Sequence, residues 1–154
     1  MAQQRPAEYA VKAAYIYNFG KFAKWPSVAQ TFNICVLGKD PFGGELDRIV
    51  LGETIDGKPI VVRRMIDFNH GHDCQILFLS NSERGKLSAI LAQVQNLPIL
   101  TVSDAPDFVE RGGMIQFELQ NDRVRFSINL RSAREAKLNI SSDLLRVASR
   151  VEGK

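Results

Sequence analysis

Residues 97–129 carry the clearest hydrophobic pattern in the chain, and it predicts a strand followed by a helical turn. Residues 99–102 are a short apolar run rich in β-branched side chains, which indicates a buried strand. Ser103 and Pro106 favour the start of a short helix, because serine caps helices and proline suits their first turn. The glycine pair at 112–113 would end that helix, since glycine adopts positive φ without strain.

The rest of this stretch predicts a β-hairpin. Apolar and polar side chains alternate through residues 114–119 and again through residues 123–128, as in strands with one covered face. Asn121 and Asp122 separate the two runs and are typical of a tight turn. We therefore expect two antiparallel strands after the buried one.

Strands and helices alternate through the chain before this stretch. The sequence predicts strands at residues 32–37, 58–64 and 75–80, and helices at residues 9–24, 45–51, 83–95, 132–137 and 142–151. Alternating strands and helices imply right-handed crossovers and a parallel sheet. We expect a three-layer α/β sandwich of the Rossmann-like or receiver-like kind, with about six strands and the antiparallel hairpin at one edge. The first and last helices are candidates to lie together, and residues 5–151 are expected to form a single domain.

The predicted helix at residues 9–24 is apolar around much of its circumference. Lys12, Lys21 and Lys24 occupy the remainder of its surface. One interpretation is a helix buried on two sides, and the other is a helix that packs on a second copy of the chain. The second interpretation predicts a homodimer, and the aromatic side chains that would contact the second copy are Tyr15, Phe19 and Phe22.

Composition and charge narrow the classes of function. Hydrophobic residues make up 45% and charged residues 24% of the chain, as in ordinary globular proteins. The net charge is +3, and the basic residues are scattered rather than gathered in a stripe, which argues against nucleic-acid binding. The apolar runs are much shorter than the ~20 residues of a membrane span, so we expect no membrane insertion.

No catalytic, cofactor-binding or metal-binding residues are predicted. The glycine-bearing loop at residues 38–44 matches neither nucleotide-binding motif, and His70 and His72 have only Cys74 nearby as a further soft ligand. The motifs of serine hydrolases and zinc peptidases do not occur. A receiver domain needs an aspartate at the end of the third strand, where this chain has Ser80 and Asn81. We therefore do not expect an enzyme.

An ordered set of short motifs resembles the YfiR-like family of periplasmic regulatory proteins. The motifs are A-Y-I-Y-N-F-x-K-F-x-x-W-P, I-C-V-L-G-x-D-P-F-G, C-Q-I-L-F-L-S, L-T-V-S-D, G-G-M-I-x-F, R-F-S-I-N and I-S-S-D-L-L. They extend from about residue 9 to residue 151. The resemblance implies export to the periplasm, and we expect that the natural leader was removed before the start Met1-Ala2-Gln3-Gln4.

The same resemblance implies a function. Such proteins repress an inner-membrane diguanylate cyclase by contacting its periplasmic portion, which lowers cyclic di-GMP and biofilm formation. An outer-membrane lipoprotein sequesters them in turn. The partner of this chain is expected to be such a cyclase or a sensor kinase. The alternative is a periplasmic small-molecule sensor that feeds another membrane signalling protein, with its ligand in an aromatic-lined groove.

The hairpin is expected to carry part of the partner surface, because one face of a sheet-edge hairpin must be covered or used. The candidate partner-binding residues are Met114, Ile115, Phe117, Phe126, Ser127 and Asn129.

Cys35 and Cys74 are the two cysteines of the chain. Cys35 lies in the first predicted strand and Cys74 directly before the third, and these strands are neighbours in a sheet of order 2-1-3-4. Neighbouring strands lie ~4.8 Å apart, which is compatible with a disulfide. In the oxidising periplasm we expect either this disulfide or two buried reduced thiols.

Overall fold

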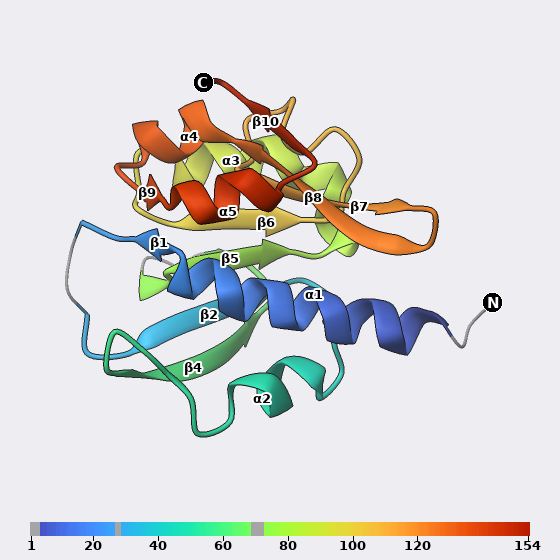
Figure 1. The fold of residues 1–154 in the computed structure, drawn as a ribbon, viewed down its shortest axis with the longest axis vertical. Helices are drawn as coiled ribbons and strands as arrows, with labels where there is room; N and C mark the ends of the chain where they lie inside the picture. The colour runs from blue at the N-terminus through green and yellow to red at the C-terminus, as the bar shows by residue number, and fades with distance from the viewer. Residues whose placement is uncertain (1–3, 27–28, 69–72) are drawn as a thin grey trace.

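The computed structural model describes residues 4–26, 29–68 and 73–154, and a twisted sheet runs through its centre (Figure 1). The helices are α1 (Gln4–Lys21), α2 (Glu45–Val50), the 3₁₀-helix η2 (Asn81–Lys86), α3 (Leu87–Val94), α4 (Leu130–Glu135) and α5 (Ser142–Val147). The strands are β1 (Ala23–Lys24), β2 (Phe32–Leu37), β3 (Thr54–Ile55), β4 (Lys58–Met65), β5 (Ile76–Leu79), β6 (Leu100–Ser103), β7 (Ile115–Gln120), β8 (Arg123–Asn129), β9 (Asn139–Ile140) and β10 (Arg150–Glu152).

Within the described residues, eight strands form one sheet in the order β10-β8-β7-β6-β5-β2-β4-β3. The strands from β4 to β7 pair in parallel, and β7 and β8 form the antiparallel hairpin. This confirms the predicted α/β class and the mostly parallel sheet. The sheet has more strands than the expected six or so, because the short strands β3 and β10 extend it at both ends.

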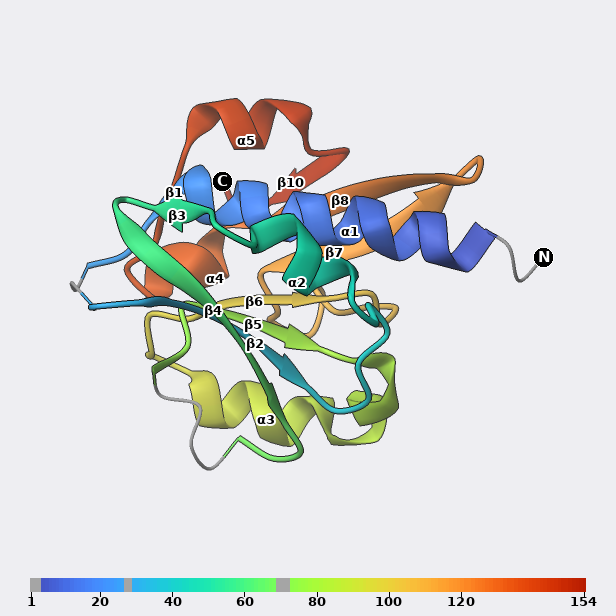
Figure 2. The same cartoon turned by 90° about the horizontal axis from the view of Figure 1, so that it is seen from below.

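Helices cover both faces of the sheet, as expected for three layers (Figure 2). The larger apolar cluster joins α1, α2, α4 and α5 to one face, with the fully buried Ile16, Ile34 and Phe78 among its members. The other cluster joins α3 to the opposite face through Leu87 and Leu77. Alternate residues of β2 and β5 thus enter different clusters, which explains why both strands are buried along their whole length.

The end of α1 and the start of α5 meet, as the sequence suggested. β1 directly follows α1 and pairs antiparallel with β9, which directly precedes α5. The backbone N–H of Ser141 also donates to the carbonyl of Phe22 at 2.8 Å. Ser141 caps α5 by accepting a hydrogen bond from the N–H of Asp143.

The predicted last helix is wrong beyond Val147. The chain turns extended at Ala148, where ψ is 144°. Ser149 then donates hydrogen bonds to the carbonyl of Phe126 from its N–H at 2.9 Å and from its hydroxyl at 3.0 Å. These bonds place the following residues beside β8 as the parallel strand β10. The antiparallel hairpin lies at this edge of the sheet as predicted, and the short strand β10 extends the edge by three residues.

The predicted helix between β6 and β7 is also wrong, because this segment consists of turns. Asp107 has a φ of +64°, a left-handed conformation that a continuous helix cannot contain. The conformation directs Phe108 into full burial. Gly113 lies against that ring, since a Cβ at this position would approach Phe108 to within 2.3 Å. Apolar burial thus decides the path of this segment.

The predicted hairpin turn is confirmed. Asn121 and Asp122 have φ angles of +54° and +63°. Positive φ at both central residues is the signature of the turn that matches the twist of two-residue hairpins. The predicted helix at residues 83–95 is present, but it starts as η2, which has Ser80 as its N-cap.

Cys35 and Cys74 form a disulfide with a Cα–Cα distance of 6.0 Å. β2 and β5 are parallel neighbours, as the sequence analysis required for this pairing. Both cysteines are buried in the cluster beneath α3. In the part of the chain that the structure describes, none of the helices has the length and hydrophobicity that crossing a membrane requires.

Candidate binding cleft at the carboxyl edge of the sheet

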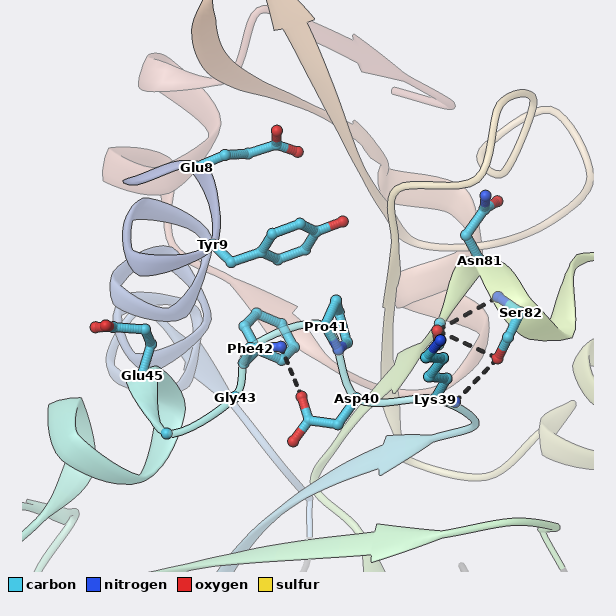
Figure 3. Close-up of a pocket in the computed structure, with 12 residues that line it drawn as sticks. Glu8, Tyr9, Lys39, Asp40, Pro41, Phe42, Gly43, Glu45, Asn81 and Ser82 are labelled. Carbon is cyan, nitrogen blue, oxygen red and sulfur yellow. Dashed lines mark hydrogen bonds between the residues drawn. The ribbon is translucent and has the colours of Figure 1, made fainter. Parts of the chain in front are cut away.

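A cleft of about 770 Å³ opens at the carboxyl ends of β2 and β5 (Figure 3). The chain leaving β2 enters α2 on one face of the sheet, whereas the chain leaving β5 enters η2 and α3 on the other face. The two loops diverge for that reason and leave a crevice between them, which is where open α/β sheets bind ligands. The N-terminal half of α1 forms the third wall through Glu8 and Tyr9.

The two loops of the cleft are fixed to each other through Ser82. Its hydroxyl accepts a hydrogen bond from the backbone N–H of Lys39 at 2.9 Å. Gly38 makes this approach possible, because a Cβ at that position would lie 2.6 Å from the same hydroxyl oxygen. Gly38 also has a φ of +95°, which other residues rarely adopt. The geometry therefore accounts for the glycine directly after β2.

Asp40 shapes the loop after β2 by accepting hydrogen bonds on both carboxylate oxygens. One oxygen accepts from the N–H of Phe42 at 2.7 Å, and the other accepts from Nε of Arg64 at 2.6 Å. The guanidinium of Arg64 also pairs with Asp47 on α2. The hydrogen bond to Asp47, followed by that to Asp40, raises the pKa of Arg64 above its ordinary value. Asp40 therefore holds the loop against β4 and, through Arg64, against α2.

The floor of the cleft is aromatic. Phe42 is buried and packs edge-on against Phe78 of β5, with ring centroids 4.8 Å apart. Tyr9 contacts Phe42 from above at 5.5 Å, and its ring projects from α1 into the space between the two loops (Figure 3). The rim is polar, with Glu8, Lys39, Glu45, Asn81 and Ser82. An aromatic floor with a mixed polar rim suits a small polar molecule that has one apolar face.

Beside this cleft, a buried ion cluster anchors α1 to the end of β6. Lys12 is only 2% exposed, and its ammonium lies 2.5 Å from Glu8 and 3.1 Å from Asp104. The hydroxyl of Tyr9 donates to the same Asp104 oxygen at 2.6 Å. The ammonium also lies 4.4 Å from the centre of the Tyr9 ring. Two carboxylates and an aromatic face thus replace the water that Lys12 loses on burial.

The hydrophobic pattern did not predict this cluster, since it placed Lys12 on the polar surface of the first helix. Two signals in the sequence point to it. Glu8 and Lys12 have the i,i+4 spacing of a helical ion pair. Asp104 directly follows a buried strand, so its carboxylate lies at the carboxyl edge of the sheet.

The candidate metal ligands His70 and His72 lie outside the described residues. Among the residues that are described, no three His, Cys, Asp or Glu side chains gather closely enough to hold a metal ion.

The candidate partner-binding residues of the hairpin are mostly covered within the chain. Met114, Ile115, Phe117, Phe126 and Ser127 are all buried, and Asn129 is half-buried. The Asn129 side chain caps α4 and donates to the carbonyl of Val109. The five buried side chains close the core, so in a single chain they offer no free surface, whereas Asn129 is partly accessible. The hairpin side chains that do reach solvent are Leu119, Gln120, Asn121, Asp122, Arg123 and Arg125.

Two of the three candidate dimer residues also pack inside the chain. Phe19 is fully buried, with its ring centroid 5.1 Å from that of Phe126 and 5.8 Å from that of Phe117. Tyr15 stacks on Phe19 and contacts Phe126 at 5.3 Å. The helix is thus buried on two sides, the first of the two interpretations offered. Phe22, 39% exposed, is the member of the trio that a second copy could contact.

Three comparisons with known proteins were informative to different degrees: one matched a family, one matched solved structures and one found no match. The sequence profile of a family described as YfiR/HmsC-like matches residues 9–149. No curated protein matches the sequence significantly. Eight chains of solved structures match, and one of them is a conserved domain protein from Vibrio cholerae O1 biovar El Tor strain N16961.

That Vibrio structure is 10% identical to this chain and superposes with a TM-score of 0.62. The match covers 91% of this chain and 60% of the Vibrio chain, so this chain spans less than two thirds of that structure. At such low identity the likeness establishes the fold alone.

Proposed function

This chain belongs to the YfiR/HmsC-like family, and on that premise we propose that it represses an inner-membrane diguanylate cyclase from the periplasm by direct contact. The family consists of periplasmic regulators of such cyclases and is not catalytic. Its match to residues 9–149, nearly the whole chain, is the observation that carries the proposal. Repression lowers cyclic di-GMP, and with it biofilm formation. An outer-membrane lipoprotein that sequesters the protein would relieve the repression.

The test measures cyclic di-GMP in cells that export this protein to the periplasm together with a membrane diguanylate cyclase that has a periplasmic portion. The nucleotide level should fall when the protein is exported. The matched control is the same cyclase without its periplasmic portion, which should not respond, because the contact surface has been removed. An equal fall with both cyclases would contradict repression by periplasmic contact, and no fall with either would contradict repression itself.

A second candidate function is a small-molecule sensor, and the cleft at the carboxyl edge is the observation that favours it. Its position between diverging loops and its aromatic floor are typical of ligand sites. Thermal-shift titration with amino acids, sugars and nucleotides should then reveal a ligand that raises the melting temperature.

Variants distinguish a ligand in the cleft from one bound elsewhere. Lys39→Ala changes the rim of the cleft and should remove the shift, whereas Lys86→Ala changes an exposed residue of η2 and should leave it intact. A shift that survives Lys39→Ala and also a bulky Ser82→Trp replacement would place the ligand outside the cleft.

A further inference from the structure

The free end of the hairpin and the N-terminal half of α1 frame a second concavity. Both segments extend beyond the body of the sheet on the same side of the molecule in both views (Figures 1 and 2). A groove of about 530 Å³ lies between them. One wall is α1, with Ala7, Val11 and Tyr15, and the other is the hairpin, with Leu119 and Val124.

The walls of this groove are apolar and open to solvent. Val11 is 44% exposed and Leu119 is 54% exposed, although both are large aliphatic side chains. At the inner end, Tyr15 packs on Phe126 and Phe117 at 5.3 and 6.1 Å, so the groove starts from the aromatic core. An exposed apolar groove that is continuous with the core is a typical binding surface.

The spacing on α1 indicates what shape the groove accepts. Ala7, Val11 and Tyr15 follow one another at intervals of four residues, so they form a single ridge along the helix. Such a ridge packs into the groove between the side chains of another helix. An apolar helical face laid between α1 and the hairpin would cover Val11 and Leu119 together.

The charges around the groove indicate the chemistry of the occupant. Arg123 and Arg125 line its outer side, and both are exposed. Neither arginine forms an ion pair with another residue in the described part of the chain. Of the two acidic residues that line the groove, Glu8 is already paired with Lys12, which leaves Asp122. Two unpaired guanidinium groups therefore face one carboxylate, and they complement an acidic partner.

We propose that this groove binds an amphipathic helix of the cyclase's periplasmic portion, with its apolar face on Val11 and Leu119 and acidic side chains on Arg123 and Arg125. The inference rests on the proposed function for the identity of the partner. The proposed contact residues differ from the buried hairpin residues predicted from the sequence, because Val11, Leu119, Arg123 and Arg125 all reach solvent.

The test measures the affinity of the purified periplasmic portion for variants of the full chain by titration calorimetry. Leu119→Glu places a charge in the apolar groove and should weaken binding at least tenfold. Val147→Glu is the matched control, because Val147 on α5 is 59% exposed, close to the exposure of Leu119, and lies outside the groove. This control should bind like the unchanged protein. Circular dichroism and melting temperature establish that both variants fold.

A second pair of variants tests the charges. Arg123→Glu with Arg125→Glu should weaken binding about tenfold and reduce its dependence on salt, because two charge-assisted contacts are lost. Arg131→Glu with Arg134→Glu, on exposed positions of α4, is the control of equal charge change and should have a much smaller effect.

The outcomes separate the two proposals. If the unchanged protein binds the periplasmic portion and the groove variants bind equally well, the groove is the wrong surface while the proposed function stands. If the unchanged protein does not bind, both proposals fail. If Leu119→Glu leaves binding intact but halves the mass measured by light scattering, the groove holds a second copy of this chain, which overturns the proposed occupant.

Discussion

Lys12 is a charged side chain within an apolar cluster, and its neighbours explain how the chain tolerates it there. Glu8 contributes a carboxylate from the same helix, and Asp104 contributes one from the end of β6. The hydroxyl of Tyr9 satisfies Asp104 further. This ion cluster links α1 to the carboxyl edge of the sheet. It therefore also positions the N-terminal half of α1, which forms a wall of both the cleft and the groove.

Replacing Lys12 should lower the stability of the fold, because the carboxylates of Glu8 and Asp104 would then lack their cation. Lys12→Met keeps the length of the side chain but removes its charge, so we expect the free energy of unfolding to fall by about 3 kcal/mol. Urea denaturation followed by circular dichroism measures this change. Lys86→Met is the control at an exposed position and should change stability by less than about 0.5 kcal/mol. Equal stability of both variants would mean that the ion cluster makes no net contribution.

Gly113 should tolerate no side chain, because Phe108 occupies the space beside it. A Cβ there would lie 2.3 Å from the buried ring, so Gly113→Ala must displace Phe108. We expect a loss of about 2 kcal/mol from this overpacking, measured by urea denaturation. Gly85→Ala is the control, since a Cβ at that position would have open space around it. If the two alanine variants lose the same stability, steric conflict with Phe108 is not the cause.

The strand β10 is the element that changes the role of the hairpin. It pairs with β8 along Ser127, Ile128 and Asn129 and so covers the base of the hairpin from outside. The tip beyond these residues has no such cover among the described elements, and there the side chains of Leu119 and Arg123 reach solvent. The hairpin is thus a core element at its base and an exposed surface at its tip.

The disulfide links β2 to the segment before β5 and should stabilise the fold. It closes a loop of 39 residues, so the chain-entropy argument gives roughly 3–4 kcal/mol. Replacing both Cys35 and Cys74 by alanine should lower the free energy of unfolding by about that amount in protein folded under oxidising conditions. Under strong reductant the unchanged protein should approach the stability of this variant.

Mass spectrometry checks that the bond is present before these stabilities are compared. Protein exported to the periplasm and denatured with an alkylating agent, without reductant, should carry no alkyl groups. Two alkylated cysteines would show that the thiols are reduced there, and the predicted stability difference would then have no basis.

At the scale of the whole molecule, α1 connects the two concave surfaces. Its residue Glu8 lines both the cleft at the carboxyl edge and the groove beside the hairpin. Other large apolar side chains are exposed away from both surfaces, among them Phe22, Leu51 and Ile66. Exposed apolar side chains on several elements favour further contacts between proteins.

A homodimer remains the prediction for the free protein. Light scattering at tens of micromolar should give twice the chain mass of 17.2 kDa. Phe22→Ser should shift the protein toward the monomer, because it removes the exposed aromatic side chain at the end of α1 without touching the buried Phe19. Gln95→Ser, an exposed change on the opposite face of the sheet, should leave the mass unchanged. A monomer mass for the unchanged protein would contradict the prediction.

The sequence by itself determined the elements whose signals are local. The two-residue period of β7 and β8, the residues of their turn and the apolar runs of β2, β5 and β6 are all set by neighbours along the chain. From these elements the handedness of crossovers gave the parallel sheet, and hence the adjacency of Cys35 and Cys74. The ordered motifs also gave the family. Apart from the crossover rule, none of these inferences required knowledge of contacts between residues that are distant in sequence.

Only the tertiary structure decided the features that depend on distant partners. Lys12 is buried because Asp104, 92 residues away in sequence, meets it at the end of β6. Residues 150–152 form a strand because Ser149 bonds to Phe126, 23 residues earlier. The turns between β6 and β7 replace a helix because Phe108 gains more from burial against Gly113 than a short helix offers. Local propensities differ by about 1 kcal/mol or less, so burial and ion pairs that join distant segments override them.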